Sequence, residues 1–422
     1  MKKKIISTVL AATMIGTICS STVMADDNVT FTIYNSKTEI LTQLEEKAEE
    51  YSEAHGVNIE IYFSQDSKDT VSAHMATKYA ANDPYTLSMV DAKDIYSLAP
   101  EHGIDLSDQD WVNNTDYAIS IDGKVYGFPV SVEARGVIYN ADAIEKIIGE
   151  KFNPEDYKTL EQFKGLLEKL SAGGMETPVG ILKEDWSLAA HYMMEIYEQQ
   201  DDTDAFIQGL HDGTEDLMKN EKFNSLMDTF DVLMEYNYAK DAPVVAEREV
   251  TEQKLAEGEI AFMFGGNWDW SVMNAFDYSE NMGIMPIPQD TDDGTNEKLV
   301  GGGSKFFFID SSDNTSDAQR KAAEDFLDWL VNDSEGQHFI VDDCSLIPAF
   351  SNNTLQISDP LGQTVKKYAD EGKLIPNYNY MPGDFISIEG ASFQKYLAGE
   401  IDRKAFASEI EEYWKNTEPI AH

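Results

Sequence analysis

The sequence is poor in basic residues. Of its 422 residues, 32 are lysine or arginine and 77 are aspartate or glutamate, which gives a formal net charge of −45. So negative a chain repels phosphate groups, and this argues against binding to nucleic acid or to anionic membrane surfaces. Cysteine is scarce as well, with two residues, Cys19 and Cys344. If Cys19 belongs to a removed leader, no intrachain disulfide can form, and a chain of this length needs none.

The sequence also lacks the common motifs of catalytic and metal sites. It contains no His-Glu-x-x-His motif, no pair of cysteines that could hold a metal, and no two histidines at zinc-ligand spacing. It also lacks the Gly-x-Ser-x-Gly motif of serine hydrolases. Gly301–Lys305 looks superficially like a phosphate loop, but its spacing is wrong and a strand pattern follows where a helix is required. We therefore expect no metal, no cofactor and no catalysis. A glycosidase stays open, because it needs only two well-placed carboxylates.

The first 25 residues differ from the rest. Lys2, Lys3 and Lys4 precede a mostly apolar stretch, and small residues flank Met24 at a cleavable position. This pattern predicts a signal peptide over residues 1–25, cleaved after Ala25, and hence an extracytoplasmic protein, in the periplasm, secreted or held at the cell surface. Lipid attachment at Cys19 is disfavoured, because Ile18 stands where a small residue is needed. No later apolar run reaches the roughly 18 residues of a membrane-spanning helix.

Hydrophobic periodicity predicts an α/β fold. Alternation of apolar and polar residues predicts strands, and recurrence every three to four residues predicts helices between them. The strands are expected at 29–35, 57–63 and 85–90, and the helices at 40–51 and 68–81, the first of them stopping at Gly56. A β-α-β-α-β order favours a sheet with parallel strands and crossover helices.

The remainder of the chain continues this pattern without a linker or a repeat. Asp122-Gly123 predicts a tight hairpin turn, and Asn140 is a good cap for a helix over 141–148. Residues 155–240 and the last 60 residues are mostly helical in pattern, with further strands at 136–139, 260–264, 283–287 and 305–309 and a helix at 318–331. A chain of this length without a linker predicts two domains joined by strands that cross between them.

Aromatic residues stand beside polar ones in the segment Gly265–Ser271. Its glycines allow a ligand to approach the backbone, and Trp268 and Trp270 offer flat apolar faces with an N–H donor. A sugar ring has a C–H face and a rim of hydroxyls, so it suits such a surface. The alternative is that one or both tryptophans belong to the core.

Three segments resemble a known family. Leu255–Ser271, Tyr126–Asn140 and Ala322–Leu330, the last followed by Ser334–Gln337 and Ile347-Pro348, are similar to signature segments of family 1 extracellular solute-binding proteins of ABC sugar importers, among them the maltose- and maltodextrin-binding proteins. The resemblance implies an α/β, two-lobe, periplasmic-binding-protein-like (type II) fold with hinge strands and a ligand cleft between the lobes. It implies an N-lobe of residues 26–132 plus 302–348 and a C-lobe of residues 133–301 plus 349–422.

The same resemblance implies a set of cleft residues. Glu133 matches an acid that hydrogen-bonds sugar hydroxyls, Trp268 matches a stacking position, and Phe385 matches a further stacking ring for which Tyr380 is the alternative. The remaining expected ligand-binding residues are Lys37, Asp91, Arg135, Trp186 and Trp270. Two of these have plain structural alternatives: Trp186 as a core residue, and Arg135 as the partner of one of the many acids.

Around Met89–Asp94 the sequence departs from the maltose binders, which argues against maltose but not against carbohydrate. We expect a monomeric protein that captures a carbohydrate, with an oligosaccharide favoured, and delivers it to ABC transporter permease subunits. The alternatives are the same fold binding a non-sugar solute, such as a polyamine or a polyol phosphate, or a secreted glycosidase.

Overall fold

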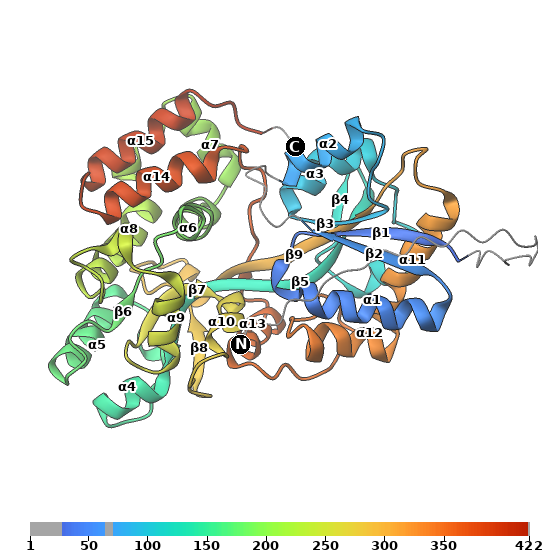
Figure 1. Cartoon of the computed structure of the whole chain (residues 1–422). Coiled ribbons are helices and arrows are strands. Elements are labelled where there is room, and N and C mark those ends of the chain that lie inside the picture. Colours follow the sequence, from blue (N-terminus) through green and yellow to red (C-terminus); the bar gives the residue numbers. More distant parts are fainter. Residues whose placement is uncertain (1–27, 64–70, 421–422) are drawn as a thin grey trace, which may run out of the picture.

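The computed structural model describes residues 28–63 and 71–420, and it folds into two lobes (Figure 1). The predicted signal peptide lies outside the described residues. Within them, every helix is too short or too polar to cross a membrane. The expected α/β, two-lobe architecture is confirmed, and the sheet that joins the lobes determines where the candidate site lies.

The N-lobe begins with the predicted β-α-β-α-β unit. Its three strands are parallel, with β1 between β2 and β3. The elements are β1 (Thr30–Asn35), α1 (Leu41–His55), β2 (Asn58–Phe63), α2 (Val71–Ala80), β3 (Leu87–Val90) and α3 (Ala92–His102). Helix α1 ends at Gly56, as predicted, because glycine tolerates the left-handed conformation seen there (φ 67°). The carboxyl ends of β1 and β3 therefore meet at one edge of the sheet.

Two long strands cross between the lobes, β5 (Lys124–Asn140) and β9 (Leu299–Ile309). They pair antiparallel, with Phe128 opposite Phe307 and Arg135 opposite Val300. They extend one sheet through both lobes in the order β2-β1-β3-β9-β5-β7-β6. The strands approach closely at Gly301, where a Cβ atom would lie 2.5 Å from the Glu133 carbonyl oxygen. The predicted hairpin between β4 (Ile119–Ile121) and β5 is present.

The C-lobe is built on the far half of β5. Strands β7 (Phe262–Gly266) and β8 (Met282–Met285) pair antiparallel with it, and β6 (Val179–Gly180) pairs with β7. Asn140 caps α4 as predicted, its side chain accepting a hydrogen bond from the Ala143 amide. The helices of this lobe are α4 (Ala141–Ile148), α5 (Leu160–Ala172), α6 (Met194–Glu198), α7 (Thr203–His211), α8 (Glu221–Glu235), α9 (Arg248–Ala256), α10 (Trp270–Met273), α13 (Pro360–Asp370), α14 (Phe385–Leu397) and α15 (Arg403–Lys415).

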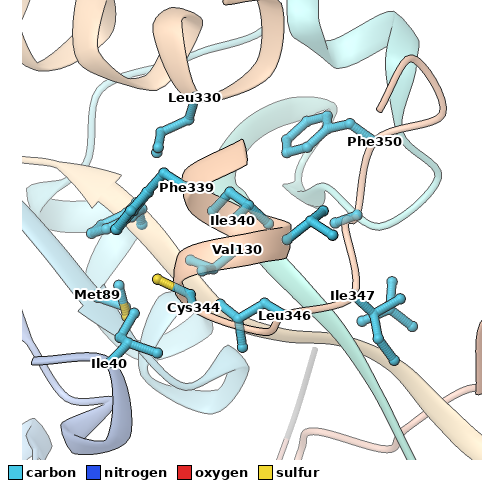
Figure 2. Packing of buried hydrophobic residues seen from close by; sticks show 14 of the residues in the cluster. Ile40, Met89, Val130, Leu330, Phe339, Ile340, Cys344, Leu346, Ile347 and Phe350 are labelled. Atoms are coloured by element: carbon cyan, nitrogen blue, oxygen red, sulfur yellow. The ribbon is translucent and has the colours of Figure 1, made fainter. Parts of the chain in front are cut away.

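Helices α11 (Asp317–Asn332) and α12 (Ser334–His338) return the chain to the N-lobe (Figure 1). Leu330 of α11 and Phe339 and Ile340 after α12 pack over Val130 of β5, with Cys344 buried in the same cluster (Figure 2). A separate buried cluster, with Trp414 among its largest side chains, lies wholly in the C-lobe. The first cluster continues past the crossing strands into the C-lobe, where Trp270, Ile284 and Leu361 belong to it.

Candidate ligand-binding cleft

A cavity of about 320 Å³ lies where the two lobes meet. Its walls come from both crossing strands, from the N-terminus of α3 in the N-lobe, and from helices and the 377–386 segment of the C-lobe. We call this cavity the cleft. It lies outside the carboxyl end of β3, at the edge of the sheet where open α/β proteins commonly bind ligands.

The N-lobe side of the cleft carries an ion pair. Asp91 directly follows β3, and its Oδ1 lies 2.5 Å from Nζ of Lys305 on β9. Burial alone would raise the pKa of Asp91, but the Lys305 ammonium holds it below its ordinary value. Lys305 adopts a left-handed backbone (φ 50°) inside a strand. Such local strain is retained mainly at functional positions, and here it accompanies the lysine that faces Asp91.

Glu133 lies where β5 and β9 cross, and both of its carboxylate oxygens have partners. Nζ of Lys37 lies 2.7 Å from Oε1, and the Ser304 hydroxyl donates to Oε2 at 2.5 Å. Lys37 is 3% exposed and also pairs with Glu39. Burial alone would lower the pKa of Lys37, but Glu133 and Glu39 raise it above its ordinary value. Lys37 therefore lies one layer behind the cleft and holds Glu133 in place.

Arg135 occupies the C-lobe side, where two buried glutamates face it. Its Nε lies 3.0 Å from Oε1 of Glu195, a terminal nitrogen pairs with Glu198, and another donates to Oδ1 of Asn377 at 3.2 Å. Burial, reinforced by Glu195, raises the pKa of Glu198 to about 7 despite the arginine. Glu198 also accepts from the Tyr378 amide at 2.9 Å. This network fixes the 377–378 segment against the cleft.

Trp268 forms the aromatic wall of the cleft. Its turn is tied to β5 by the Asn267 side chain, which accepts from the Ala134 amide at 3.0 Å, and it is closed by Asp269, which accepts from the Gly266 amide at 2.9 Å. The ring lies over Gly266, where a Cβ atom would be 2.3 Å from it. The two hydrogen bonds of this turn and the missing side chain at Gly266 therefore direct the Trp268 ring into the cavity.

His191 extends the aromatic wall from a π-helical turn, Ser187–Met193. Its ring centroid lies 4.6 Å from that of Trp268. Burial, together with the nearby charges of Arg135 and Arg248, lowers the pKa of His191 well below its ordinary value. His191 is consequently neutral near pH 7 and offers the cleft one donor or one acceptor.

The structure brings five of the predicted residues to the lining of the cleft: Asp91, Glu133, Arg135, Trp268 and Phe385. Phe385 is only 1% exposed and packs edge-on against Tyr197, 5.7 Å between centroids. A sugar ring could therefore reach only a small part of its face.

The other predicted residues lie outside the lining of the cleft. Trp270 is 8% exposed and packs edge-on against Tyr278. Trp186 lies under the guanidinium of Arg248, 4.4 Å from the ring centroid, and edge-on to His191. Tyr380 lines a neighbouring cavity instead.

Sequence analysis missed several lining residues, notably His191, Glu198, Ser304, Lys305 and Asn377. A signal is present for two of them: Ser304 and Lys305 directly follow the glycine run 301–303, and glycines allow a ligand to approach the backbone. That run proves to be part of β9, which begins at Leu299, so the strand predicted at 305–309 extends back through the glycines. Nothing in the sequence marks His191, because the π-helical turn that directs it into the cleft has no pattern distinct from an ordinary helix.

Comparisons with known proteins agree with this architecture. Solved structures that resemble the chain include a chitin oligosaccharide binding protein, at 18% identity and TM-score 0.72 over 92% of this chain and 99% of that one. The solute-binding protein RafE in complex with raffinose matches at 18% identity and TM-score 0.73, over 92% and 99% of the two chains. A sugar transporter protein of Bacillus licheniformis in complex with stachyose matches at 20% identity and TM-score 0.68, over 92% and 100%.

These likenesses establish the fold. Family membership rests on sequence: the model of the bacterial extracellular solute-binding protein family matches residues 46–369, well over half of the chain. The resemblance drawn from the three sequence segments is thereby confirmed at the level of extracellular solute-binding proteins. The chain belongs to the bacterial extracellular solute-binding protein family.

Proposed function

We propose that this protein captures a neutral carbohydrate in the cleft. The observation that carries the proposal is a balance of charge beside an aromatic wall. Among the described residues the lining holds three carboxylates, Asp91, Glu133 and Glu198, and three cations, Lys93, Arg135 and Lys305. Most of these charges are paired with one another or with a residue one layer behind. Paired charges leave oxygen and nitrogen atoms for hydroxyl groups while favouring no ionic ligand.

This balance argues against the two ionic alternatives. A polyamine is a cation and would need unpaired carboxylates in the cleft; the strongly acidic composition of the whole chain does not supply them there. A polyol phosphate is an anion and would need unpaired cations. A charged ligand would have to displace an existing partner, such as Arg135 from the buried Glu198, and leaving a buried carboxylate unpaired is costly. The ring of Trp268 suits the C–H face of a sugar, and the structural neighbours with raffinose and stachyose bound have the same fold.

The wider role follows from the family. We propose that the chain is exported by its signal peptide, is cleaved after Ala25, acts as a monomer and hands its ligand to the permease of an ABC importer without chemically changing it. We further propose that residues 26–132 plus 302–348 and residues 133–301 plus 349–422 move as the two lobes. Ligand that contacts both lobes favours their closure.

A thermal-shift screen, followed by calorimetric titration, tests the proposal. We expect at least one neutral sugar to raise the melting temperature, because a ligand at 100 times its Kd stabilises by about 2.7 kcal/mol. Spermidine and glycerol 3-phosphate are the ionic controls and should have no effect. Stabilisation by either control, with no response to neutral sugars, would show that the ligand class is wrong. Chromatography of the sugar after incubation should recover it unchanged, and a hydrolysis product would instead indicate a glycosidase.

A further inference from the structure

A second cavity, of about 730 Å³, opens beside the cleft. We call it the side chamber. Its walls include Tyr96 and Ser97 of α3, Ser120 of β4, and Tyr380 of the segment that precedes α14. Lys93, Asn379 and Met381 line both the cleft and the side chamber, so the two cavities are neighbours that share a wall.

We propose that the side chamber is a second sugar subsite continuous with the cleft, and that the ligand is an oligosaccharide of three or more units. This inference rests on the proposed function. Pockets for single small ligands measure about 300–1,000 Å³. The cleft alone is at the lower end of that range, whereas the two cavities together exceed its upper end. A mono- or disaccharide would leave the larger cavity empty.

The chemistry of the side chamber matches a sugar. The rings of Tyr96 and Tyr380 stand 4.6 Å apart and inclined at 47°, one from each lobe, and form an aromatic corner. Ser97, Ser120 and Asn379 add hydroxyl and amide groups, which can donate to and accept from the hydroxyl rim of a sugar. Its charged side chains have both signs, Lys93 against Asp94 and Asp122, so a neutral ligand is again favoured over an ionic one.

Asp94 is the least exposed of the charged residues in the wall of the side chamber. Its side chain lines the side chamber although the residue is only 1% exposed. Oδ1 accepts from the Ser72 hydroxyl, whereas Oδ2 has no hydrogen-bond partner among the described residues. A buried polar atom without a partner is costly, whether this carboxyl group is charged or neutral. This oxygen is itself buried, so Asp94 adds negative charge to the wall of the side chamber and is not counted as a contact of the sugar.

The test measures how affinity depends on chain length. Purified protein is titrated calorimetrically with three series of di-, tri- and tetrasaccharides: sucrose, raffinose and stachyose; maltose, maltotriose and maltotetraose; and the corresponding chitooligosaccharides. In the series that binds, we expect the tetrasaccharide to bind at least about tenfold more tightly than the disaccharide. Equal affinity at all lengths would overturn the proposed subsite.

Variants then locate the source of that gain. Ser120→Trp fills the chamber from an exposed position, and Tyr96→Ala removes half of the aromatic corner. Each should abolish the roughly tenfold gain for the tetrasaccharide and leave disaccharide affinity unchanged, whereas Trp268→Ala should weaken every length. Ser334→Trp, exposed on α12, is the matched control and should change nothing.

The outcomes separate this inference from the proposed function. Suppose that the Ser120→Trp and Tyr96→Ala proteins melt like the parent and still bind the tetrasaccharide with full affinity. The side chamber is then not a sugar subsite, although sugar binding in the cleft stands. Failure of the parent to bind any sugar of any length would overturn both.

Discussion

At the residue scale, the cleft combines one apolar face with charges that neutralise each other. Trp268 is accessible because Gly266 leaves room for its ring, and the neighbouring carboxylates are held by the buried Lys37 and the half-buried Lys305. These features favour a ligand that is flat, hydroxylated and uncharged. The tryptophan and the ion pairs can be tested separately, because they belong to different elements.

Replacing Trp268 tests the aromatic wall. Stacking on an aromatic face contributes on the order of 1–3 kcal/mol, so Trp268→Ala should weaken sugar binding roughly 5- to 150-fold. Trp329→Ala is the control: Trp329 is 7% exposed and packs against Tyr51 and Phe326 in the N-lobe. Its removal should reduce the free energy of unfolding by about 3–5 kcal/mol with little change in affinity. Calorimetric titration and denaturant unfolding of both variants decide the matter. Unchanged binding by Trp268→Ala would mean that the ligand does not stack there.

At the element scale, sequence patterns predicted the positions of strands and crossover helices well. They predicted less well which side chains point into the cleft. The alternation at 29–35 and the caps at Gly56 and Asn140 are local signals, so the predicted elements are present. Trp270 shows the limit: it stands two residues from Trp268, but the start of α10 turns its ring into the core. The orientation of a side chain at a strand-to-helix junction depends on packing between distant segments, which one sequence does not reveal.

Helix α14 carries an acid that should make stability depend on pH. Glu389 is fully buried, and neither carboxylate oxygen has a hydrogen-bond partner among the described residues. Burial, reinforced by Glu409, raises its pKa from 4.5 to about 8. The folded protein therefore holds a proton that the unfolded chain releases at lower pH. This contribution to stability is complete below about pH 4.5 and is lost as the pH rises through about 8.

Glu389→Gln keeps the shape of the protonated side chain and cannot ionise. Between pH 5 and pH 9, the wild type should lose on the order of 1–3 kcal/mol more stability than the variant. Denaturant unfolding at both pH values measures the difference, and the comparison cancels other groups that titrate in this range, such as Glu198. Parallel pH profiles for the two proteins would contradict the buried, protonated state of Glu389.

At the scale of the whole molecule, the crossing strands β5 and β9 connect the two lobes (Figure 1). The lining of the cleft draws on both lobes, so a bound ligand can contact both at once. A ligand that binds the closed arrangement better than the open one shifts the population toward closure by its difference in affinity. One buried cluster is confined to the C-lobe, and the other extends from the N-lobe into the C-lobe beside the crossing strands.

Small-angle X-ray scattering should detect this closure. A compact chain of about 400 residues has a radius of gyration of about 21 Å, and a two-lobe protein with an open cleft exceeds that value. Saturation with the sugar identified by titration should lower the radius of gyration toward it, because closing the lobes brings mass nearer to the centre. A sugar from the same panel that does not bind, at equal concentration, controls for solvent contrast. A radius of gyration that stays the same at saturation would mean that ligand binds without lobe closure, and delivery to a permease would then need a signal other than the shape of the closed protein.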